Sequence, residues 1–529
     1  MDTSIREMPV GIQDFEKLRT EECMYVDKTQ YVYALTRKSR PYFLGRPRRF
    51  GKSLFASTLK AYFLGKKELF EGLAIAELEK EWIEYPVIYI DFNIGSTDCM
   101  QSVEITLNSI LRRHERKWGI TAKNDTLPVR LSDLIESAYE KSGRKVVVLV
   151  DEYDRALVNT MDNPQTHKEL ITFFKGFYGV LKGIDYALRF VFLTGVSKFA
   201  KVSVFSDLNQ LIDISLDEQY AEICGISEKE LLEQFQPELH QLAKVTGKTY
   251  DETVAELKKR YDGYRFAKKG ASMYNPFSLL NTFMKNDYAY YWFKTGTPTF
   301  LANTLQKSNF DIRKLDHDVT IPLKKIDEYR ADETTLTPLL YQTGYLTIKS
   351  YDASLDEFTL GYPNEEVKYG FLDQLLPAFI PKCGLDDSFS INTFIKAVQS
   401  GEVDDFMTLL RAYYAAIPYD LEDNRDKDEK YYQLICYLLF ANMGQFVDTE
   451  VKSAKGRADV VVKTADSIYV FEFKMEENAS AEEALAQIDN QGYLIPYTAD
   501  HRRLVKIGVE FSQEARGIKR WVVGDFKCN

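Results

Sequence analysis

The chain has 529 residues, about three times the length of an ordinary domain, so we expect several domains. Hydrophobic residues make up 45% and charged residues 28%, which is typical of globular proteins, and the lack of a bilayer-length apolar stretch argues against a membrane protein. The net charge of -11 argues against a protein that coats nucleic acid through bulk positive charge, so any nucleic-acid site must be local.

The cysteine and histidine content favours a cytoplasmic protein without zinc. The six cysteines form no CxxC pair and no disulfide-like spacing, and the first residues contain no apolar signal segment. No two of the five histidines lie at ligand spacing. Any bound metal would therefore use oxygen ligands.

The first part of the chain alternates short apolar runs with helix-sized segments. The apolar runs cover residues 41–44, 87–92, 145–150 and 189–194. Such runs are typical of strands that are buried on both faces of a parallel sheet. We therefore predict a wound α/β domain over residues 1–227.

The residues between the first apolar run and the next helix have the order of a phosphate-binding loop. A turn of this kind directs backbone N–H groups and a helix N-terminus at a phosphate. Lys52 would reach the β and γ phosphates, Ser53 would ligate Mg²⁺, and Gly51 would let the backbone approach closely. The nucleotide contacts expected here are Arg46, Pro47, Arg48, Arg49, Phe50, Gly51, Lys52, Ser53 and Leu54.

The glycine spacing of this loop departs from the usual pattern. Five residues separate Gly45 from Gly51, so that Arg46 occupies the position of the first glycine. The loop favours nucleotide binding, with a structural turn as the alternative. Arg48 and Arg49 either serve their own site or are offered to a neighbouring subunit, which would make the protein a homo-oligomer.

Two adjacent carboxylates follow the apolar run 145–150. Asp151 would hold Mg²⁺ through water, and Glu152 would polarise the water that attacks the γ phosphate. The alternative is an ordinary exposed turn. Asp154 and Arg155 belong either to the site or to the surface.

Polar residues also end the next apolar run. Thr194 and Ser197 would sense the γ phosphate from this position. Equally, they would cap the turn or helix that follows.

The middle of the chain, residues 228–426, is mainly helical in pattern and rich in tyrosine and phenylalanine. Strand-like segments interrupt it at 345–348 and 357–360. The charged run 420–429 is most simply a solvated linker to a last α/β domain over 427–529. The absence of an internal repeat argues against a solenoid.

The last domain has the layout of a metal-dependent nuclease. Strand-like runs 456–462 and 467–474 carry Asp459 on the first and Glu472 with Lys474 on the second. Because strand side chains alternate, Glu472 and Lys474 share one face and can meet Asp459. The carboxylates would hold Mg²⁺ against a phosphodiester, and the lysine would stabilise the developing charge. The alternative is a half-buried meander with charged residues on its wet side.

Five motifs are spaced over most of the chain, at 25–29 (Tyr-Val-Asp-Lys-Thr), 46–53, 150–154 (Val-Asp-Glu-Tyr-Asp), 261–266 (Tyr-Asp-Gly-Tyr-Arg-Phe) and 295–300 (Thr-Gly-Thr-Pro-Thr-Phe). Together they resemble the bacterial AAA-ATPase-like proteins that carry a C-terminal PD-(D/E)xK nuclease domain. That family commonly has an arginine-rich loop without the first glycine. The resemblance implies a P-loop NTPase parallel sheet, a mainly helical middle region and a restriction-endonuclease-like α/β end, with ATP and Mg²⁺ as cofactors.

The resemblance also implies roles for single residues. Arg265 would act as a sensor arginine on the γ phosphate or form a structural ion pair. Gln487 would lie near the nuclease site, Glu450 would complete its carboxylate set, and Glu429 is a weaker candidate. The motif 25–29 looks more like scaffolding than a base-reading loop.

We therefore expect an ATP-dependent or ATP-regulated nuclease that acts on DNA. The expected catalytic residues are Glu152, Asp459, Glu472, Lys474, Gln487 and Glu450, further nucleotide contacts are Asp151, Thr194 and Arg265, and the metal ligands are Ser53, Asp151, Asp459 and Glu472. Nearby basic residues would contact the DNA backbone or form solvated surface, namely Lys452, Lys455, Arg457, Arg502 and Arg503. One alternative is a switch ATPase whose last domain binds nucleic acid or a partner without cleaving it, and another is a nucleotide-binding scaffold without turnover.

Overall fold

The computed structural model describes most of the chain, in two compact units. The described residues are 6–120, 125–161, 163–198, 204, 210–293, 305, 312–316, 319–326, 336–379, 391–415, 429–442, 444, 446–449, 458–515 and 517–525. The first unit comprises Met1–Gly296 with Leu315–Lys368, and the second comprises Thr297–Lys314 with Tyr369–Asn529. None of the described helices is long and apolar enough to cross a membrane. The boundaries expected at residues 227 and 426 stay predictions.

A five-stranded parallel sheet forms the centre of the first unit. Its spatial order is β2 (Val87–Asp91), β3 (Val146–Asp151), β4 (Leu188–Gly195), β1 (Pro41–Gly45) and β5 (Ile212–Asp213). The four predicted apolar runs are thus strands of one sheet, and the predicted fold class is confirmed. Because all five strands are parallel, their carboxyl ends meet at one edge, where such sheets bind ligands.

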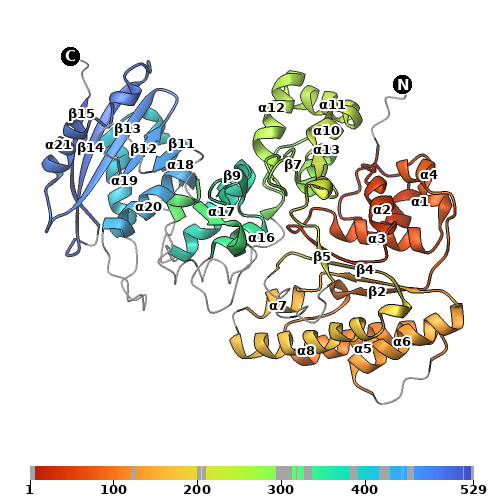
Figure 1. Cartoon of the computed structure of the whole chain (residues 1–529). Helices are drawn as coiled ribbons and strands as arrows, with labels where there is room; N and C mark the ends of the chain where they lie inside the picture. The colour runs from red at the N-terminus through yellow and green to blue at the C-terminus, as the bar shows by residue number, and fades with distance from the viewer. Residues whose placement is uncertain are drawn as a thin grey trace. The chain divides into compact units, whose positions relative to one another are not determined.

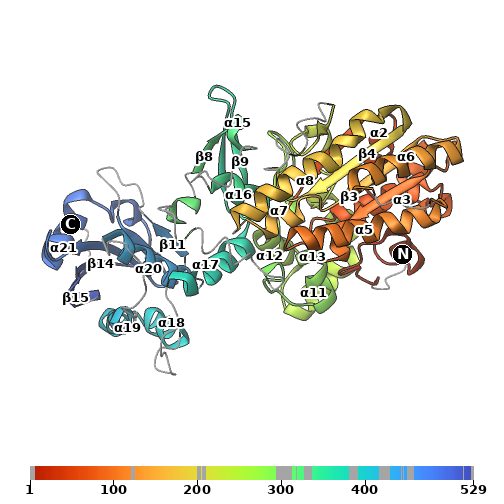
Figure 2. The same cartoon turned by 90° about the horizontal axis from the view of Figure 1, so that it is seen from below.

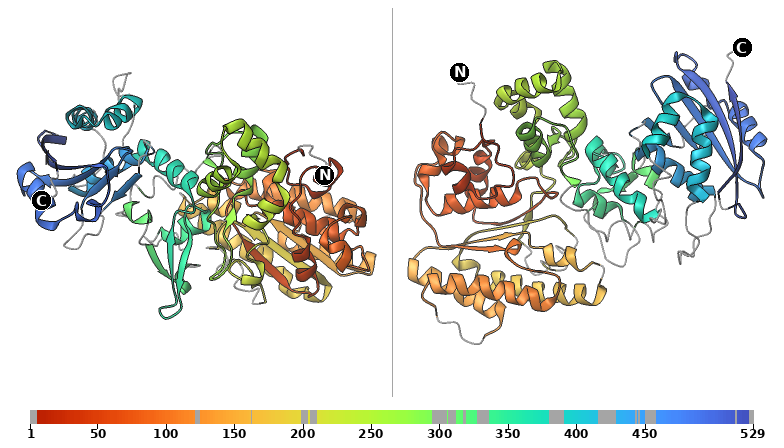
Figure 3. Two further views of the ribbon diagram at one scale, coloured as in Figure 1. Left: turned by 90° about the horizontal axis from the view of Figure 1, so that it is seen from above. Right: turned by 180° about the vertical axis from the view of Figure 1, so that it is seen from behind.

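Helices cover both faces of this sheet. Figure 1 shows one layer in red and another in orange and yellow. The red layer contains α1 (Phe15–Thr20), α2 (Thr29–Thr36), α3 (Lys52–Phe63) and α4 (Ala74–Leu78). The other contains α5 (Met100–Lys117), α6 (Leu127–Ser142) and α8 (Pro164–Gly183), and the short α7 (Arg155–Asn159) follows β3. Figure 3 shows the same layers from behind.

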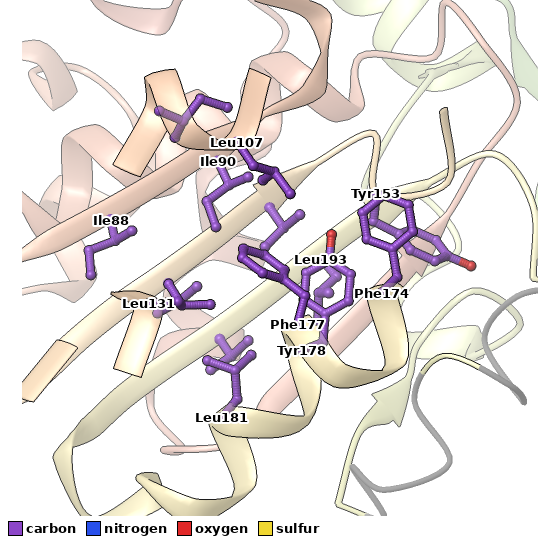
Figure 4. Close-up of a cluster of buried hydrophobic side chains, with 14 of the residues drawn as sticks. Ile88, Ile90, Leu107, Leu131, Tyr153, Phe174, Phe177, Tyr178, Leu181 and Leu193 are labelled. Atoms are coloured by element: carbon purple, nitrogen blue, oxygen red, sulfur yellow. The ribbon is translucent and has the colours of Figure 1, made fainter. Parts of the chain in front are cut away.

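The main core lies between the sheet and the orange layer. Figure 4 shows Ile90 of β2 and Leu193 of β4 facing Phe174 and Phe177 of α8, and all four side chains are fully buried. Burial of one such side chain stabilises a fold by roughly 1.5–3 kcal/mol. This core fixes β3 and β4 against each other, and so fixes the residues at their carboxyl ends.

Four further helices of the first unit pack around a second core. They are α10 (Glu228–Gln234), α11 (Gln236–Thr246), α12 (Tyr250–Tyr261) and α13 (Pro276–Lys285), with the two-stranded pair β6 (Ile226–Ser227) and β7 (Met273–Tyr274). Ser227 and Thr249 start α10 and α12 with capping boxes, in which a glutamate three residues on returns the hydrogen bond. The buried side chains of Leu239, Leu257 and Phe283 join the helices.

The rest of the first unit contains a three-stranded antiparallel sheet. Its order is β8 (Val319–Pro322), β10 (Glu357–Gly361) and β9 (Thr347–Asp352), with α15 (Leu323–Ile326) and α16 (Thr337–Thr343) beside it. These strands match the two strand-like interruptions expected in the helical middle. The helix α17 (Glu365–Phe379) begins in the first unit, and its residues from Tyr369 on belong to the second.

The second unit contains a mixed five-stranded sheet. Its order is β11 (Phe446–Thr449), β12 (Val460–Lys463), β13 (Ser467–Met475), β14 (Arg503–Ser512) and β15 (Gly517–Asp525), and of these pairs only β13 and β14 are parallel. The helix α21 (Ala481–Gln491) connects those two strands. The other helices are α18 (Ile391–Ser400), α19 (Val403–Ala415) and α20 (Glu429–Asn442), and Figure 2 shows α18 and α19 beside the sheet.

Short 3₁₀ turns occur in the described parts of both units, at Lys67–Phe70, Phe92–Ile94, Asp185–Ala187, Glu218–Tyr220, Ile312–Asp316 and Ile495–Tyr497.

Alternation along β13 divides its side chains between the two faces of this sheet. The ring of Phe471 lies 5.5 Å from that of Phe440 on α20, whereas Val470 packs with Ile488 of α21. Gly508 on the neighbouring strand lets α21 come close, because a Cβ atom there would lie 2.1 Å from the carbonyl oxygen of Ala481. Glu472 and Lys474 therefore lie on the face that α21 covers.

Candidate functional site

The predicted phosphate loop connects β1 to α3. Gly51, directly before α3, has a φ of 92°, in the left-handed region that favours glycine, and Arg49 has a φ of 69°. The Lys52 Nζ atom donates hydrogen bonds to the carbonyl oxygens of Arg46 at 3.0 Å and Pro47 at 3.1 Å. It also lies 3.4 Å from Glu152 Oε1. The lysine therefore joins the loop to the carboxyl end of β3.

Thr194 positions the two carboxylates that end β3. Its hydroxyl donates to Asp151 Oδ1 and accepts a hydrogen bond from the backbone N–H of Glu152 at 3.2 Å. Glu152 has a φ of 58°, a conformation that is rare outside glycine and that costs energy unless its surroundings hold it. Thr194 lies at the end of β4 as expected, and it is fully buried. It therefore acts on the site through its neighbours Asp151 and Glu152.

The two carboxylates differ in their electrostatics. Burial and the charge of Glu152 raise the pKa of Asp151 to about 6, although the nearby Ser53 hydroxyl and the hydrogen bond from Thr194 act in the opposite direction. Burial would also raise the pKa of Glu152, but the charges of Lys52 and Arg48 hold it below its ordinary value. Glu152 is therefore ionised at neutral pH, as a group that orients or accepts a proton from water must be.

One oxygen of Asp151 lacks a partner. The Oδ2 atom is buried and has no hydrogen-bond donor among the described residues. A buried carboxylate oxygen without a donor is costly, and a hard cation with oxygen ligands would satisfy it. The Asp151 carboxylate and the Ser53 hydroxyl therefore fit a Mg²⁺ site.

A pocket of about 410 Å³ opens beside these groups, a size within the roughly 300–1,000 Å³ of small-molecule sites. Its floor is formed by the loop and the first turn of α3, together with Glu152 and Arg155. The other walls are the segment 9–13, Asn93, Asn159, and Pro276, Phe277 and Leu280 of α13. An apolar cavity of about 90 Å³ adjoins it and shares Pro9, Leu54 and Leu280.

Arg46 does not direct its side chain at this pocket. Its buried guanidinium donates to the carbonyl oxygens of Gly45 and Ser215, both at 2.8 Å, and of Tyr220 at 2.9 Å, and it lies 4.3 Å from the ring of Phe266. The arginine thus ties the loop to the residues that follow β5. The Arg46 side chain does not face the pocket. A contact between nucleotide and the main chain of Arg46 stays a prediction. Pro47 and Phe50 also line cavities other than the 410 Å³ pocket.

Arg265 lies away from the pocket as well. The rings of Tyr264 and Phe266 face inward and lie 4.7 Å and 5.2 Å from the ring of Phe50. Alternation therefore turns Arg265 outward, where its guanidinium donates to the carbonyl oxygen of Lys349 at 3.0 Å. The expected sensor role does not match this position.

The other polar residues near β3 and β4 separate into two groups. The buried Asp154 carboxylate accepts hydrogen bonds from the backbone N–H groups of Val196 and Ser197 and, at 2.6 Å, from the Ser197 hydroxyl. Both residues are therefore structural. Arg155 instead lines the pocket and donates to Asn93 Oδ1. Sequence reasoning missed Asn93, although its place two residues after the end of β2, at the shared edge of the sheet, was a usable signal.

The second candidate site lies between β12, β13 and α21. The Lys474 Nζ atom donates to Glu472 Oε1 at 2.9 Å, and the Gln487 amide donates to the same oxygen. Asp459, directly before β12, accepts a hydrogen bond from the backbone N–H of Phe473 at 2.8 Å. The structure thus brings together Asp459, Glu472, Lys474 and Gln487 as expected.

The carboxylates of the second site repel each other. Burial and the charge of Glu472 raise the pKa of Asp459, and burial raises the pKa of Glu472 against the opposing effect of Lys474. The Glu472 Oε2 atom is buried and has no partner among the described residues. A divalent cation would remove this repulsion and satisfy that oxygen, so the pair fits Mg²⁺.

Some of the residues expected at this site are not among the described residues, namely Glu450, Lys452, Lys455 and Arg457. The separate motif 295–300 also lies outside the described residues. Within the described ranges, no three His, Cys, Asp or Glu side chains meet as a complete metal cluster. Glu429 starts α20, and its charge helps to raise the pKa of Asp459 after burial and Glu472, so this residue lies nearby.

Two of the expected DNA-contacting arginines form ion pairs on the surface. Arg502 lies 2.6 Å from a carboxylate oxygen of Asp500, and Arg503 lies 2.8 Å from one of Asp525. These contacts favour the alternative that both arginines are ordinary surface residues.

Comparisons with known proteins find two family models and a relative that spans nearly the whole chain. Residues 9–205 match the model of a family described as predicted AAA-ATPase, and residues 427–521 match the PD-(D/E)XK nuclease superfamily. An uncharacterized protein in the vnfD 5′ region of Azotobacter chroococcum mcd 1 is 34% identical over 525 residues, which cover 98% of this chain and 99% of that protein. Among solved structures, the Aeropyrum pernix ORC2 protein in ADPNP–ADP complexes has 11% identity and a TM-score of 0.24, over 73% of this chain and 93% of its own. The extent of the first two findings assigns the family: this chain belongs to the predicted AAA-ATPases that end in a domain of the PD-(D/E)XK nuclease superfamily.

Proposed function

We propose that this protein binds and hydrolyses ATP with Mg²⁺ and that its C-terminal domain hydrolyses DNA phosphodiesters under the control of that ATP. One observation carries the proposal. In each site a buried carboxylate has one oxygen without a donor among the described residues, Asp151 in the first and Glu472 in the second. A lysine ammonium lies 3.4 Å from the adjacent Glu152 in the first site and 2.9 Å from Glu472 itself in the second. Such an arrangement suits a cation that carries a phosphate group.

In the first site, the residues divide the work of phosphoryl transfer. Ser53 and Asp151 would hold Mg²⁺, which neutralises the charge of the phosphates. Lys52 would turn from the carbonyl oxygens of the loop to the β and γ phosphates. Glu152, kept ionised by Lys52 and Arg48, would orient the attacking water and accept its proton.

In the second site, Asp459 and Glu472 would hold Mg²⁺, which activates water and neutralises the leaving oxygen. Lys474 would stabilise the negative charge that develops on the phosphate, because its ammonium group is fixed by Glu472. Gln487 would keep the Glu472 carboxylate in its present orientation from α21.

Steady-state phosphate release tests the first half of this proposal. We expect turnover by the wild type and a loss of at least about a hundredfold in Glu152→Gln, the lower range for a general base. ADP binding should persist in this variant, because the loop is intact. Nucleotide binding without turnover in the wild type would instead identify a scaffold.

Cleavage of single-stranded and double-stranded DNA and of RNA, with ATP, a slowly hydrolysed analogue or no nucleotide, tests the second half. Asp459→Ala and Lys474→Ala should abolish cleavage, and Asp466→Ala, in the exposed turn between β12 and β13, serves as the control. Cleavage that neither responds to ATP nor depends on Asp459 and Lys474 would refute the proposal.

A switch ATPase whose last domain binds without cleaving remains the second candidate. The presence of Asp459, Glu472 and Lys474 together argues against it. Wild-type protein that binds DNA in the presence of Mg²⁺ but leaves it intact would identify this function.

The loop arginines bear on the assembly of the protein. The guanidinium of Arg49 lies 4.6 Å from the ring of Phe277 in its own pocket, and the charge of Arg48 acts on its own Glu152. Both contacts favour arginines that serve their own site. Homo-oligomerisation and a cytoplasmic location stay part of the proposal, to be tested by light scattering and by fractionation.

A further inference from the structure

The motif 261–266 belongs to neither site, yet it contacts the phosphate loop. The rings of Tyr264 and Phe266 pack on Phe50 of that loop. In the middle of the motif, Gly263 has a φ of 107°, and a Cβ atom there would lie 2.1 Å from the carbonyl oxygen of Pro363. The motif therefore holds the chain directly before α17 as well as the loop.

Three consecutive residues connect the first turn of α17 to other segments of the first unit. The Asn364 amide donates to the carbonyl oxygen of Asp262 at 2.8 Å and accepts a hydrogen bond from the backbone N–H of Val367 at 3.1 Å. Glu365 lies 2.9 Å from the Lys259 ammonium. These contacts attach the helix start to the end of α12.

The third of these residues, Glu366, leads to the phosphate loop by two routes. Its buried Oε1 atom accepts hydrogen bonds from the Ser278 hydroxyl and from the backbone N–H of Trp292, both at 2.9 Å. The Trp292 indole N–H in turn donates to the carbonyl oxygen of Arg48 at 3.3 Å. Ser278 directly follows Phe277, whose ring contacts the guanidinium of Arg49.

The Glu366 carboxylate is sensitive to the loss of either donor. Burial raises its pKa to about 7, and its Oε2 atom has no partner among the described residues. A buried oxygen acceptor that loses its donor is left unsatisfied, which costs free energy. A small shift of the Arg48 carbonyl group or of Phe277 would therefore change the hydrogen bonds of Glu366, and with them the first turn of α17.

We propose that Gly263, Trp292, Asn364 and Glu366, here called the α17 joint, transmit nucleotide binding from the phosphate loop to α17. Trp292 and Glu366 are positioning residues, because they act through the Arg48 carbonyl and the helix start and not on the nucleotide. Residues of α17 from Tyr369 on belong to the second unit, so the joint acts on the segment by which the chain returns to that unit. The inference rests on the proposed binding of nucleotide to the loop.

Hydrogen–deuterium exchange of the full-length protein, with and without saturating Mg²⁺–ADP, tests the joint. In the wild type, ADP should change the exchange rate of amides 365–370 by about tenfold, the size expected when one buried acceptor loses its donor. Trp292→Phe keeps an aromatic ring but loses the N–H donor. This variant should bind ADP within about threefold of the wild type and lose most of the exchange response, because only the route through Ser278 remains.

Two controls separate the joint from general damage. Trp82→Phe changes another indole of the first unit, whose N–H has no partner among the described residues, and should keep the full response. Glu366→Gln keeps the accepting oxygen and should keep the response, whereas Glu366→Ala should lose it. Loss of the response in Glu366→Gln as well would refute a hydrogen-bonded joint.

The outcomes distinguish this inference from the function on which it rests. Absence of ADP binding in the wild type would refute both. Binding of ADP without a change in residues 365–370 would refute the joint and leave nucleotide binding standing. An undiminished response in Trp292→Phe would refute the route through Trp292.

Discussion

Protonation of Asp151 should weaken Mg²⁺-dependent nucleotide binding below pH 6. The pKa of this buried carboxyl is raised to about 6, and its free Oδ2 atom is the expected cation ligand. At pH 5, one unit below that pKa, only about one molecule in ten carries the charge. We therefore expect the affinity for Mg²⁺–ADP to fall about tenfold between pH 7 and pH 5 through this group alone.

Equilibrium titration of the protein with Mg²⁺–ADP across this pH range measures the effect. Asp151→Asn should bind more weakly at pH 7 and lack the step, and it corrects for the titration of the nucleotide itself. Thr194→Val removes a hydroxyl donor that acts to lower the pKa of Asp151, so the midpoint of its step should move to higher pH. An identical pH dependence in the wild type and in Asp151→Asn would refute the assignment of Asp151.

The same pKa shift predicts an effect on stability. Because the pKa of Asp151 rises from 3.8 to about 6 on folding, its contribution to stability is present below about pH 4 and is lost as the pH rises through 6. About 1.4 kcal/mol of this contribution disappears between pH 5 and pH 8. Asp151→Asn should therefore gain that amount relative to the wild type over the same interval, as measured by urea unfolding without nucleotide.

Three further predictions concern other parts of the chain. Asp154→Ala leaves buried donors of the turn after β4 unpaired and should destabilise the first unit by about 3 kcal/mol in urea unfolding, whereas Asp154→Asn should lose less. Arg46→Lys cannot reach three carbonyl oxygens and should lower thermal stability by about 2 kcal/mol, against no change for the control Arg37→Lys; equal melting curves would contradict this. The pKa values of Asp459 and Glu472 are raised, so Mg²⁺ binding to them should release protons and should strengthen as the pH rises. Calorimetry in buffers of different ionisation enthalpy measures this proton release, and the same heat in all buffers would contradict it.

Local patterns predicted the features that depend on local chemistry. Buried parallel strands require continuous apolar runs, so the four runs predicted the positions of β1 to β4. The residues that directly follow such strands necessarily lie at the carboxyl edge of the sheet. Alternation along one strand likewise placed Glu472 and Lys474 on one face. Both clusters of polar side chains could therefore be predicted from the sequence.

Features that depend on long-range packing were not visible. Arg265 looked like a phosphate ligand by type, but the inward rings on both sides of it turn its side chain outward. Arg46 looked like part of the loop, and its guanidinium instead binds carbonyls about 170 residues away in sequence. Trp292 and Glu366 carried no motif at all, because their roles arise only from contacts between distant segments.

Gly508 offers a practical marker for the relatives of this protein. Any side chain there would collide with the backbone of α21, at 2.1 Å from the carbonyl oxygen of Ala481 and 2.6 Å from the backbone nitrogen of Leu485. The helix would then move outward and carry Gln487 away from Glu472. In a genome survey, a relative that keeps the carboxylates and the lysine but replaces this glycine would be a candidate for a decayed nuclease, and restoring glycine by mutagenesis would be a direct way to attempt its revival.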